Sequence, residues 1–488
     1  MGLLQRAGGT LTARAEEADI LVVNTCSFID SAKQESVNTI LEMAQHKVAN
    51  GGKAQRLIVA GCLVERYRDE IRRNIPEVDA VVGTGELEAI LEAAGLTPQA
   101  QSAVGDSPFN ILVSRAPSAV HQHSHPTEVG AQLEIAQGAK FSRAEGDARE
   151  RSGRFSRAHW DGATAALPEY LYSDETPRIL TTPRASAYIK IAEGCDHPCS
   201  FCVIPQLRGK FRSRRLESIV AEAERLIAQG VREITLIGQD TTCYGEDLGL
   251  RDGLATLLDA LAVLPGLKWL RFLYAYPNKV TTRLLETMAR HESIAKYLDV
   301  PLQHASPSVL KRMKRGGTAE VFLRLIEKAR AVVPGIVLRS TFIVGFPGES
   351  DEDFEQLCDF VAAAKIDWLG VFSYSDEEGA AAFGIDAELK VPKRTIEARR
   401  RRLMKLQQKI SAKAKRAWVG REVEVLVEGE SEETELLWQG RTALHAPEID
   451  GKVLINDFGP HETLVPGTFY RAEITESHDY DVVARILE

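Results

Sequence analysis

Three cysteines in one short loop constrain this 488-residue chain more than any other feature of its sequence. Cys195, Cys199 and Cys202 follow a C-x3-C-x2-C spacing, which can bring three thiols to one point and provides no fourth cysteine nearby. Iron–sulfur clusters that only store electrons usually take four cysteines. Three thiolates on four irons would leave one iron open to bind a small molecule. We therefore expect a 4Fe–4S cluster with an open iron at this loop.

A zinc site is the main alternative, because C-x2-C pairs are common among zinc ligands. Zinc would need a fourth ligand, and His197 lies inside the loop, where it cannot easily complete a tetrahedron. The position of the loop favours the cluster. Residues 188–192 alternate as a strand does and lead into Gly194, so the cysteines follow the C-terminal end of a strand. Barrel enzymes keep their active sites at that end.

The length and composition indicate a multidomain globular protein. The chain is too long for one core, and its 44% hydrophobic and 26% charged residues are ordinary for a soluble protein. We find no run of about 18 apolar residues that would span a membrane, and no signal peptide follows Met1. Seven cysteines are too few and too irregular for a disulfide framework, which predicts a reducing, cytoplasmic location.

The first segment, residues 1–98, alternates strands and helices, which predicts a parallel, doubly wound sheet. We expect strands over residues 19–24, 56–60 and 78–83, and helices from about Ser31 and over 64–74. Ligands of such sheets bind beyond the carboxyl ends of the strands. Cys26 and Cys62 both lie there, so we expect them to be metal ligands; inert core cysteines are the alternative.

The second segment, residues 99–180, loses this periodicity and is rich in small and polar residues. A loop of this length without structure of its own is usually a linker or disordered. Its three neighbouring histidines, His121, His123 and His125, could bind a metal together. Solvated linker histidines are the simpler interpretation.

The third segment, residues 181–417, again alternates strands and helices, which predicts a (β/α) barrel or partial barrel. The loops after its strands would face the three-cysteine loop. They carry the candidates for cofactor contact: Gln239, Asp240, Gln303, His304 and Gly345. The segment ends in a basic helix that begins near residue 393, and its charges either face water or touch a nucleic acid.

The last segment, residues 418–488, consists of short alternating strands with Gly and Pro turns, which predicts a small, closed or nearly closed, antiparallel β-barrel. Residues 420–488 hold 5 Lys and Arg against 16 Asp and Glu, a net charge of −11, while residues 1–419 carry +2. Such a surface would repel a phosphate backbone and attract a basic protein. Improved solubility alone is the alternative explanation.

Together these motifs resemble the methylthiotransferases, a branch of the radical S-adenosylmethionine enzymes. The resemblance covers nearly the whole chain except residues 99–180, and rests on NTCSFID, GCLVERY, HPCSFCVIPQLRGKFRSR, the GQDTT before Cys243, PLQHAS and YSDEEG. Within the family the chain is most similar to the members that methylthiolate the β-carbon of an aspartate in ribosomal protein uS12. Members that modify tRNA adenosine, the alternative, carry an asparagine where Asp240 stands.

The resemblance implies two 4Fe–4S clusters and S-adenosylmethionine as cofactors, and a TRAM domain at the C-terminus. In the family, one cluster cleaves S-adenosylmethionine to a radical that takes hydrogen from the substrate, and the second presents the sulfur. Cys26 and Cys62 match two of the three cysteines that hold the second cluster. The loop 343–349, with Gly345 and Gly348, would support the cofactor. The implied partners are uS12, an electron donor and a sulfur donor, with tRNA not expected.

One cysteine of the family pattern has no counterpart in this sequence. With the first strand of the sheet it would fall before Met1, which leaves the second cluster incompletely ligated in the chain as given. We expect a start codon placed too far downstream, and a cysteine in a C-P-K or similar context within about 25 residues upstream. Cys243 is a less favoured substitute ligand, and Cys358 is expected in the core. A partner-binding protein without activity is the third hypothesis.

Overall fold

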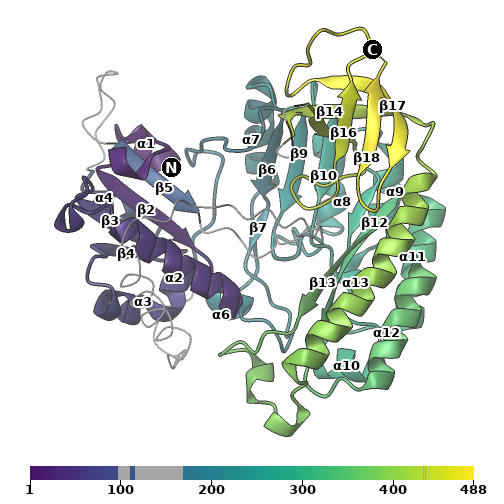
Figure 1. The fold of residues 1–488 in the computed structure, drawn as a ribbon, viewed down its shortest axis with the longest axis horizontal. Helices are drawn as coiled ribbons and strands as arrows, with labels where there is room; N and C mark the ends of the chain where they lie inside the picture. Colours follow the sequence, from purple (N-terminus) through teal and green to yellow (C-terminus); the bar gives the residue numbers. More distant parts are fainter. Residues whose placement is uncertain (97–109, 116–168, 432–433, 435, 488) are drawn as a thin grey trace.

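The computed structural model describes residues 1–96, 110–115, 169–431, 434 and 436–487. In Figure 1 these residues form an N-terminal α/β layer in purple, a larger barrel-like body in teal and green, and a small β-barrel in yellow. No helix in this part of the chain combines the length and the apolar character needed to cross a membrane.

The N-terminal layer is a five-stranded parallel sheet with the order β1-β5-β2-β3-β4. Its strands are β1 (Thr10–Leu11), β2 (Ile20–Thr25), β3 (Arg56–Gly61), β4 (Ala80–Val82) and β5 (Asn110–Arg115), and its helices are α1 (Gly2–Arg6), α2 (Asp30–Ala44), α3 (Cys62–Asn74) and α4 (Ala89–Ala94). Alternate residues of β2 face opposite sides: Leu21 packs with α2 and α3, and Val22 with α1 and α4. The doubly wound sheet is therefore confirmed.

Strand β5 corrects the expectation that residues 99–180 contain no regular structure. It pairs in parallel with both β1 and β2, and Ile111 lies opposite Ile20. A single six-residue run is easily overlooked when low-complexity sequence surrounds it, because strand periodicity needs several repeats to be visible. His121, His123 and His125 lie outside the described residues.

The central body is a partial barrel of six parallel strands, as predicted. They form two three-stranded sheets, β10-β9-β6 and β11-β12-β13, which meet where Leu270 bridges Ile294. The strands are β6 (Ser186–Lys190), β9 (Glu233–Ile237), β10 (Trp269–Phe272), β11 (Tyr297–Asp299), β12 (Val337–Val344) and β13 (Trp368–Ser373). The helices around them are α7 (Leu216–Ala228), α8 (Gly253–Ala262), α9 (Thr282–Arg290), α10 (Pro307–Arg312), α11 (Ala319–Val332), α12 (Asp351–Ala364) and α13 (Lys393–Arg416).

The C-terminal residues form a closed barrel in the order β14-β15-β16-β18-β17, which confirms the predicted small barrel. The expectation that it is wholly antiparallel was wrong: β16 and β18 pair in parallel, because a closed ring of five strands cannot alternate direction throughout. Its strands are β14 (Glu422–Glu430), β15 (Trp438–Arg441), β16 (Val453–Asp457), β17 (Phe469–Ser477) and β18 (Val482–Ile486). Inward residues such as Ile455 and Ile474 are fully buried and alternate with more exposed ones, as a barrel requires, whereas the outward Leu426 of β14 is buried against Trp269 of the central body.

The small barrel covers the N-terminal ends of the central strands. Arg441 donates hydrogen bonds to Glu233 (2.7 Å) and to Ser186 (3.2 Å), the first residues of β9 and β6. Tyr297, the first residue of β11, donates to Asp450 (2.6 Å). Figure 1 shows the yellow strands against this end of the body. The opposite, C-terminal ends of the central strands are therefore the ones available for a site.

A buried ion cluster joins the N-terminal layer to the central body. Glu377, on the loop after β13, accepts hydrogen bonds from Lys33 of α2 (3.1 Å) and from Arg66 of α3 (3.4 Å). Arg66 also donates to the carbonyl oxygens of Ser27 (2.8 Å) and Glu378 (2.9 Å). The side chains of Lys33, Arg66 and Glu377 are 5%, 0% and 2% exposed. These contacts fix the layer beside the C-terminal ends of the central strands.

Candidate active site

The three-cysteine loop begins where the first central strand ends. After β6 the chain forms the short strand β7 (Ala192–Glu193), passes the cysteines and helix α6 (Ile204–Arg208), and returns as β8 (Arg212–Ser213), which pairs antiparallel with β7. Gly194 has φ +84°, and a Cβ there would lie 2.1 Å from the Lys210 carbonyl oxygen. Only glycine fits this turn, which closes the base of the loop.

Distant parts of the chain hold the middle of the loop. The Ser200 amide donates to the Met313 carbonyl (3.0 Å), and the Ser200 hydroxyl donates to the Arg312 carbonyl (2.8 Å). The Ala382 amide in turn donates to the Ser200 carbonyl (2.7 Å). Ser200 is thus bound by three hydrogen bonds between Cys199 and Cys202, so the spacing of these cysteines is set by the surrounding body.

The three thiols are partly exposed at the surface of this loop. Burial raises the pKa of Cys195 to about 11 and that of Cys202 to about 12. These thiols stay protonated at neutral pH until a metal displaces the protons. In the described residues, the only group with ligand atoms close enough for a single ion is His197, Asp240 and Cys243, so the three thiols are too widely spaced for one zinc. Their arrangement fits a larger cluster.

Arg315, Tyr276 and His197 are stacked in a row beside the cysteine loop, at the C-terminal ends of the central strands. Arg315 approaches the Cys199 sulfur (3.7 Å) and places its guanidinium over the Tyr276 ring (4.3 Å). The other neighbour of this ring is His197, which stacks on it with centroids 3.8 Å apart. The arginine adds positive charge beside a cysteine sulfur, and the stack limits the positions that His197 can take.

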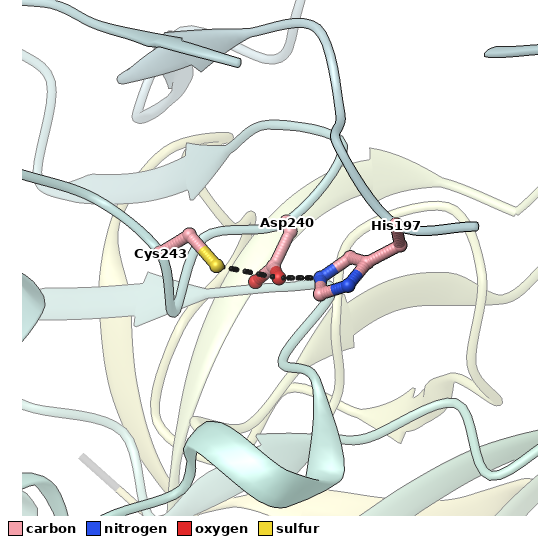
Figure 2. A group of neighbouring side chains, drawn as sticks. All are labelled: His197, Asp240 and Cys243. Atoms are coloured by element: carbon pink, nitrogen blue, oxygen red, sulfur yellow. Dashed lines mark hydrogen bonds and ion pairs between the residues drawn. The ribbon is translucent and has the colours of Figure 1, made fainter. Parts of the chain in front are cut away.

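Asp240 is the centre of a hydrogen-bond network beside the loop (Figure 2). Its carboxylate binds the His197 ring at Nε2 (2.5 Å) and accepts from the Cys243 thiol (3.1 Å) and from the amide and hydroxyl of Thr242 (2.8 and 2.5 Å). Burial alone raises the pKa of Asp240, but these hydrogen bonds outweigh it and hold the pKa below its usual value. The carboxylate has no position left for an ion, so we interpret the group as a hydrogen-bond network.

Gln239 and Gln303 lie at the same end of the barrel. Gln239 accepts a hydrogen bond from the Gly194 amide (2.9 Å) and donates to Glu193 (3.1 Å), so it orients the start of the cysteine loop. Gln303 has φ +73°, which is uncommon for a residue with a side chain, and its backbone pairs with β12 beside Phe342. Gln239 therefore acts on the loop directly, and Gln303 is held in a constrained conformation near it.

His304, Gly345 and Gly348 have surroundings that sequence reasoning did not predict. His304 is fully buried; burial lowers its pKa to about 3, so it stays neutral, and its Nδ1 accepts from the Ser306 amide (3.0 Å). A Cβ on Gly345 would meet the Ile396 side chain at 2.3 Å, and one on Gly348 would meet Arg312 at 3.1 Å. Both glycines also have positive φ. Neighbouring protein side chains and positive φ therefore already require glycine at both positions, independently of the cofactor contact that the sequence suggested.

Cys26 and Cys62 lie together, as the sequence predicted. Thr25 and Gly61 are paired in neighbouring strands, and the two cysteines follow them directly. Burial raises the pKa of both thiols, and Arg208 opposes this. Arg208 belongs to α6 of the cysteine loop and donates to the Cys62 sulfur (3.1 Å). One side chain thus connects the two groups of cysteines.

The remaining cysteines are separate. Cys243 belongs to the Asp240 network, and Cys358 is buried in the main core, as predicted. Arg208 and Arg315 are the functional candidates that sequence reasoning missed. The only signal for Arg208 is its position between the third cysteine and the returning strand β8, and Arg315 carries none, because its partner Cys199 lies 116 residues away.

Comparison with known proteins agrees with this arrangement. Residues 189–361 match the model of the Radical SAM superfamily, residues 419–487 match that of the TRAM domain, and residues 1–83 match the "Uncharacterized protein family UPF0004". The fold, the cysteine loop and these matches define a radical S-adenosylmethionine enzyme with a C-terminal TRAM domain. Membership of this superfamily implies S-adenosylmethionine and a 4Fe–4S cluster as cofactors.

Curated relatives identify the branch. The chain is 65% identical over 487 residues to the ribosomal protein uS12 methylthiotransferase RimO of Koribacter versatilis (strain Ellin345), covering 100% of this chain and 92% of that protein. It is 53% identical to RimO of Solibacter usitatus (strain Ellin6076), covering 100% and 90%. The chain belongs to the RimO family of methylthiotransferases. A solved structure of TsrM from Kitasatospora setae is similar over 72% of this chain and 62% of that one, with 15% identity and a TM-score of 0.45.

Proposed function

We propose that this chain transfers a methylthio group to the β-carbon of an aspartate in ribosomal protein uS12. The observation that carries the proposal is the three-cysteine loop, closed by β7 and β8 and fixed at Ser200, at the C-terminal ends of the barrel strands. The two RimO relatives at 65% and 53% identity are named for this substrate. The Asp240 network beside the loop fits the same assignment, since tRNA-modifying members of the resembled family carry asparagine there.

We assign Cys195, Cys199 and Cys202 to the radical cluster. When bound, that cluster supplies the electron that cleaves S-adenosylmethionine into methionine and a 5'-deoxyadenosyl radical, which takes a hydrogen atom from the substrate. Arg315 places positive charge next to Cys199. Gln239 holds the backbone of Gly194 at the base of the loop.

The other predicted contacts complete the assignment. Asp240 fixes the His197 ring by hydrogen bonding. Gln303, His304, Gly345 and Gly348 remain proposed cofactor contacts.

We further propose that Cys26 and Cys62 are ligands of a second cluster. Their adjacency and the approach of Arg208 favour metal binding over an inert core role. The described residues supply two of the three thiolates that the resemblance implies for this cluster. An electron donor and a sulfur donor are required partners in this scheme, and we place the reaction in the cytoplasm. The net charge of −11 over residues 420–488 favours a basic protein substrate over tRNA.

The experiment separates the two cysteine groups after anaerobic reconstitution of the full chain. Substituting Cys195, Cys199 or Cys202 by Ala should abolish the formation of 5'-deoxyadenosine from S-adenosylmethionine. Cys26→Ala or Cys62→Ala should preserve this cleavage and stop methylthiolation of purified uS12, measured by mass spectrometry. Cys358→Ser is the control, because this thiol belongs to the core. Undiminished methylthiolation by Cys26→Ala would show that the second cluster is wrongly assigned.

A further inference from the structure

Helix α13 carries an unusual concentration of positive charge. Its 24 residues include eleven Lys and Arg and a single acidic residue, Glu397, in a chain whose net charge is −9. Four of the eleven are paired with a carboxylate or buried. Arg399 pairs with Glu349, Arg400 with Glu397 and Arg402 with Glu355, and Lys415 is buried against Trp368.

The other seven cations point into solvent. They are Lys393, Arg394, Arg401, Lys405, Lys409, Lys413 and Arg416. All seven are exposed, and none of them forms an ion pair or a hydrogen bond with a described residue. At 3.6 residues per turn, six of them, from Arg394 to Arg416, occupy an arc of about 120° opposite the buried residues Leu403 and Gln407. We call these six residues the basic stripe.

The basic stripe extends from the active-site end of the barrel to the small C-terminal barrel. Near the start of α13, Ser373, the last residue of β13, donates to Glu397 (2.6 Å). Near its end, Lys415 lies 3.5 Å from the ring of Trp368, the first residue of β13. The helix therefore lies antiparallel to β13 along the outside of the body, as Figure 1 shows in green. Arg394 to Arg416 spans about 33 Å, which is long enough to follow several phosphates of a nucleic-acid backbone.

We propose that the basic stripe binds the backbone of structured RNA. Cations about one helical turn apart on long flexible side chains can each reach a phosphate. A membrane surface fits less well, because the residues between the cations are small ones such as Ala398 and Ala412, and the apolar residue at the edge of the stripe, Leu406, packs against the core. The acidic Glu355 on the flank pairs with Arg402 and would confine a phosphate backbone to the stripe itself.

This inference rests on the proposed substrate and extends it. A ribosomal protein is held on ribosomal RNA, and a stripe that starts at the active-site end would bring RNA-bound uS12 to the cysteine loop. RNA is then a docking surface and not the modified molecule. The acidic C-terminal barrel and the basic stripe occupy different elements, so one enzyme can contact a basic protein and the RNA that carries it.

The test measures binding of the full-length protein to a fluorescein-labelled RNA hairpin and, separately, to purified small ribosomal subunits. The variant is Arg401→Gln/Lys405→Gln/Lys409→Gln. The matched control is Arg324→Gln/Lys328→Gln/Arg330→Gln on α11, three exposed cations with the same change in net charge. We expect the stripe variant to bind both at least tenfold more weakly. The slope of log K against log salt should fall in magnitude by about 2.7, at about 0.9 for each duplex phosphate that is no longer neutralised.

Three results decide the outcome. Equal loss of RNA binding in the control, or no loss in the stripe variant, overturns the proposal. Binding to vesicles of anionic lipid that depends on the stripe, without RNA binding, would replace RNA by a membrane surface. Methylthiolation of free uS12 should be the same in wild type and stripe variant. Its absence from both would refute the proposed function while leaving the RNA-binding result to stand by itself.

Discussion

The most direct test of the architecture is to neutralise Glu377. This carboxylate is 2% exposed and is the shared partner of Lys33 and Arg66, so Glu377→Gln leaves two buried cations without it. Removing one partner of a buried ion pair costs about 3–5 kcal/mol. Lys33 keeps its contact with Asp30 (2.5 Å), and Arg66 keeps two carbonyl acceptors, so we expect the lower end, about 3 kcal/mol.

The loss should appear as local opening of the interface and not as global unfolding. If the free energy of local opening falls by about 3 kcal/mol, the open state becomes about a hundredfold more populated, and amide hydrogens that exchange through it exchange about a hundredfold faster. We expect this acceleration at residues 27–33, 62–66 and 377–382, measured by mass spectrometry, with β9 and β12 unchanged. Glu388→Gln is the control, since it removes the same charge from an exposed carboxylate farther along the chain. Exchange at wild-type rates in Glu377→Gln would refute the view that this carboxylate fixes the N-terminal layer.

Two further predictions concern buried groups. Burial lowers the pKa of Lys415 to about 8, whereas an unfolded lysine titrates near 10.4, so the unfolded state binds more protons between these values and stability rises with pH. The free energy of unfolding of Lys415→Met, measured with urea, should therefore exceed that of wild type by up to about 3 kcal/mol at pH 7. This difference should vanish near pH 10.5. A difference that does not change with pH would contradict the argument. Asp240→Asn should leave the iron content unchanged and lower the rate of uS12 methylthiolation about tenfold or more. This factor corresponds to the loss of one charge-assisted hydrogen bond, the one between Asp240 and His197. An unchanged rate would exclude a role for the network.

Local pattern was sufficient to predict much of this fold. Strand β2 is a continuous apolar run, as expected of a strand covered on both faces, and parallel pairing with β3 then places Cys26 beside Cys62 without further information. Strand β5 was missed because a lone run of six residues carries too little periodicity. The sequence did not decide between a full and a partial barrel, because that depends on which strands pair.

The supporting contacts could not be predicted, because they join residues far apart in the chain. Arg208 and Cys62 are 146 positions apart, and Lys33 and Glu377 are 344 apart. No local signal specifies such pairs. Gly345 illustrates the same limit: its φ of +79° suits glycine, but the side chain that occupies the adjacent space, Ile396, comes from α13, 51 residues later in the chain.

The hydrogen bonds of Ser200 also order events during synthesis. The cysteine loop leaves the ribosome before Arg312, Met313 and Ala382 exist, and it is the backbone of these later residues that holds Ser200 in place. A nascent chain that ends before residue 382 therefore has all three thiols in a segment without its final shape. Iron delivered at that stage would find cysteines that are not yet fixed, so productive cluster assembly requires a chain synthesised beyond residue 382.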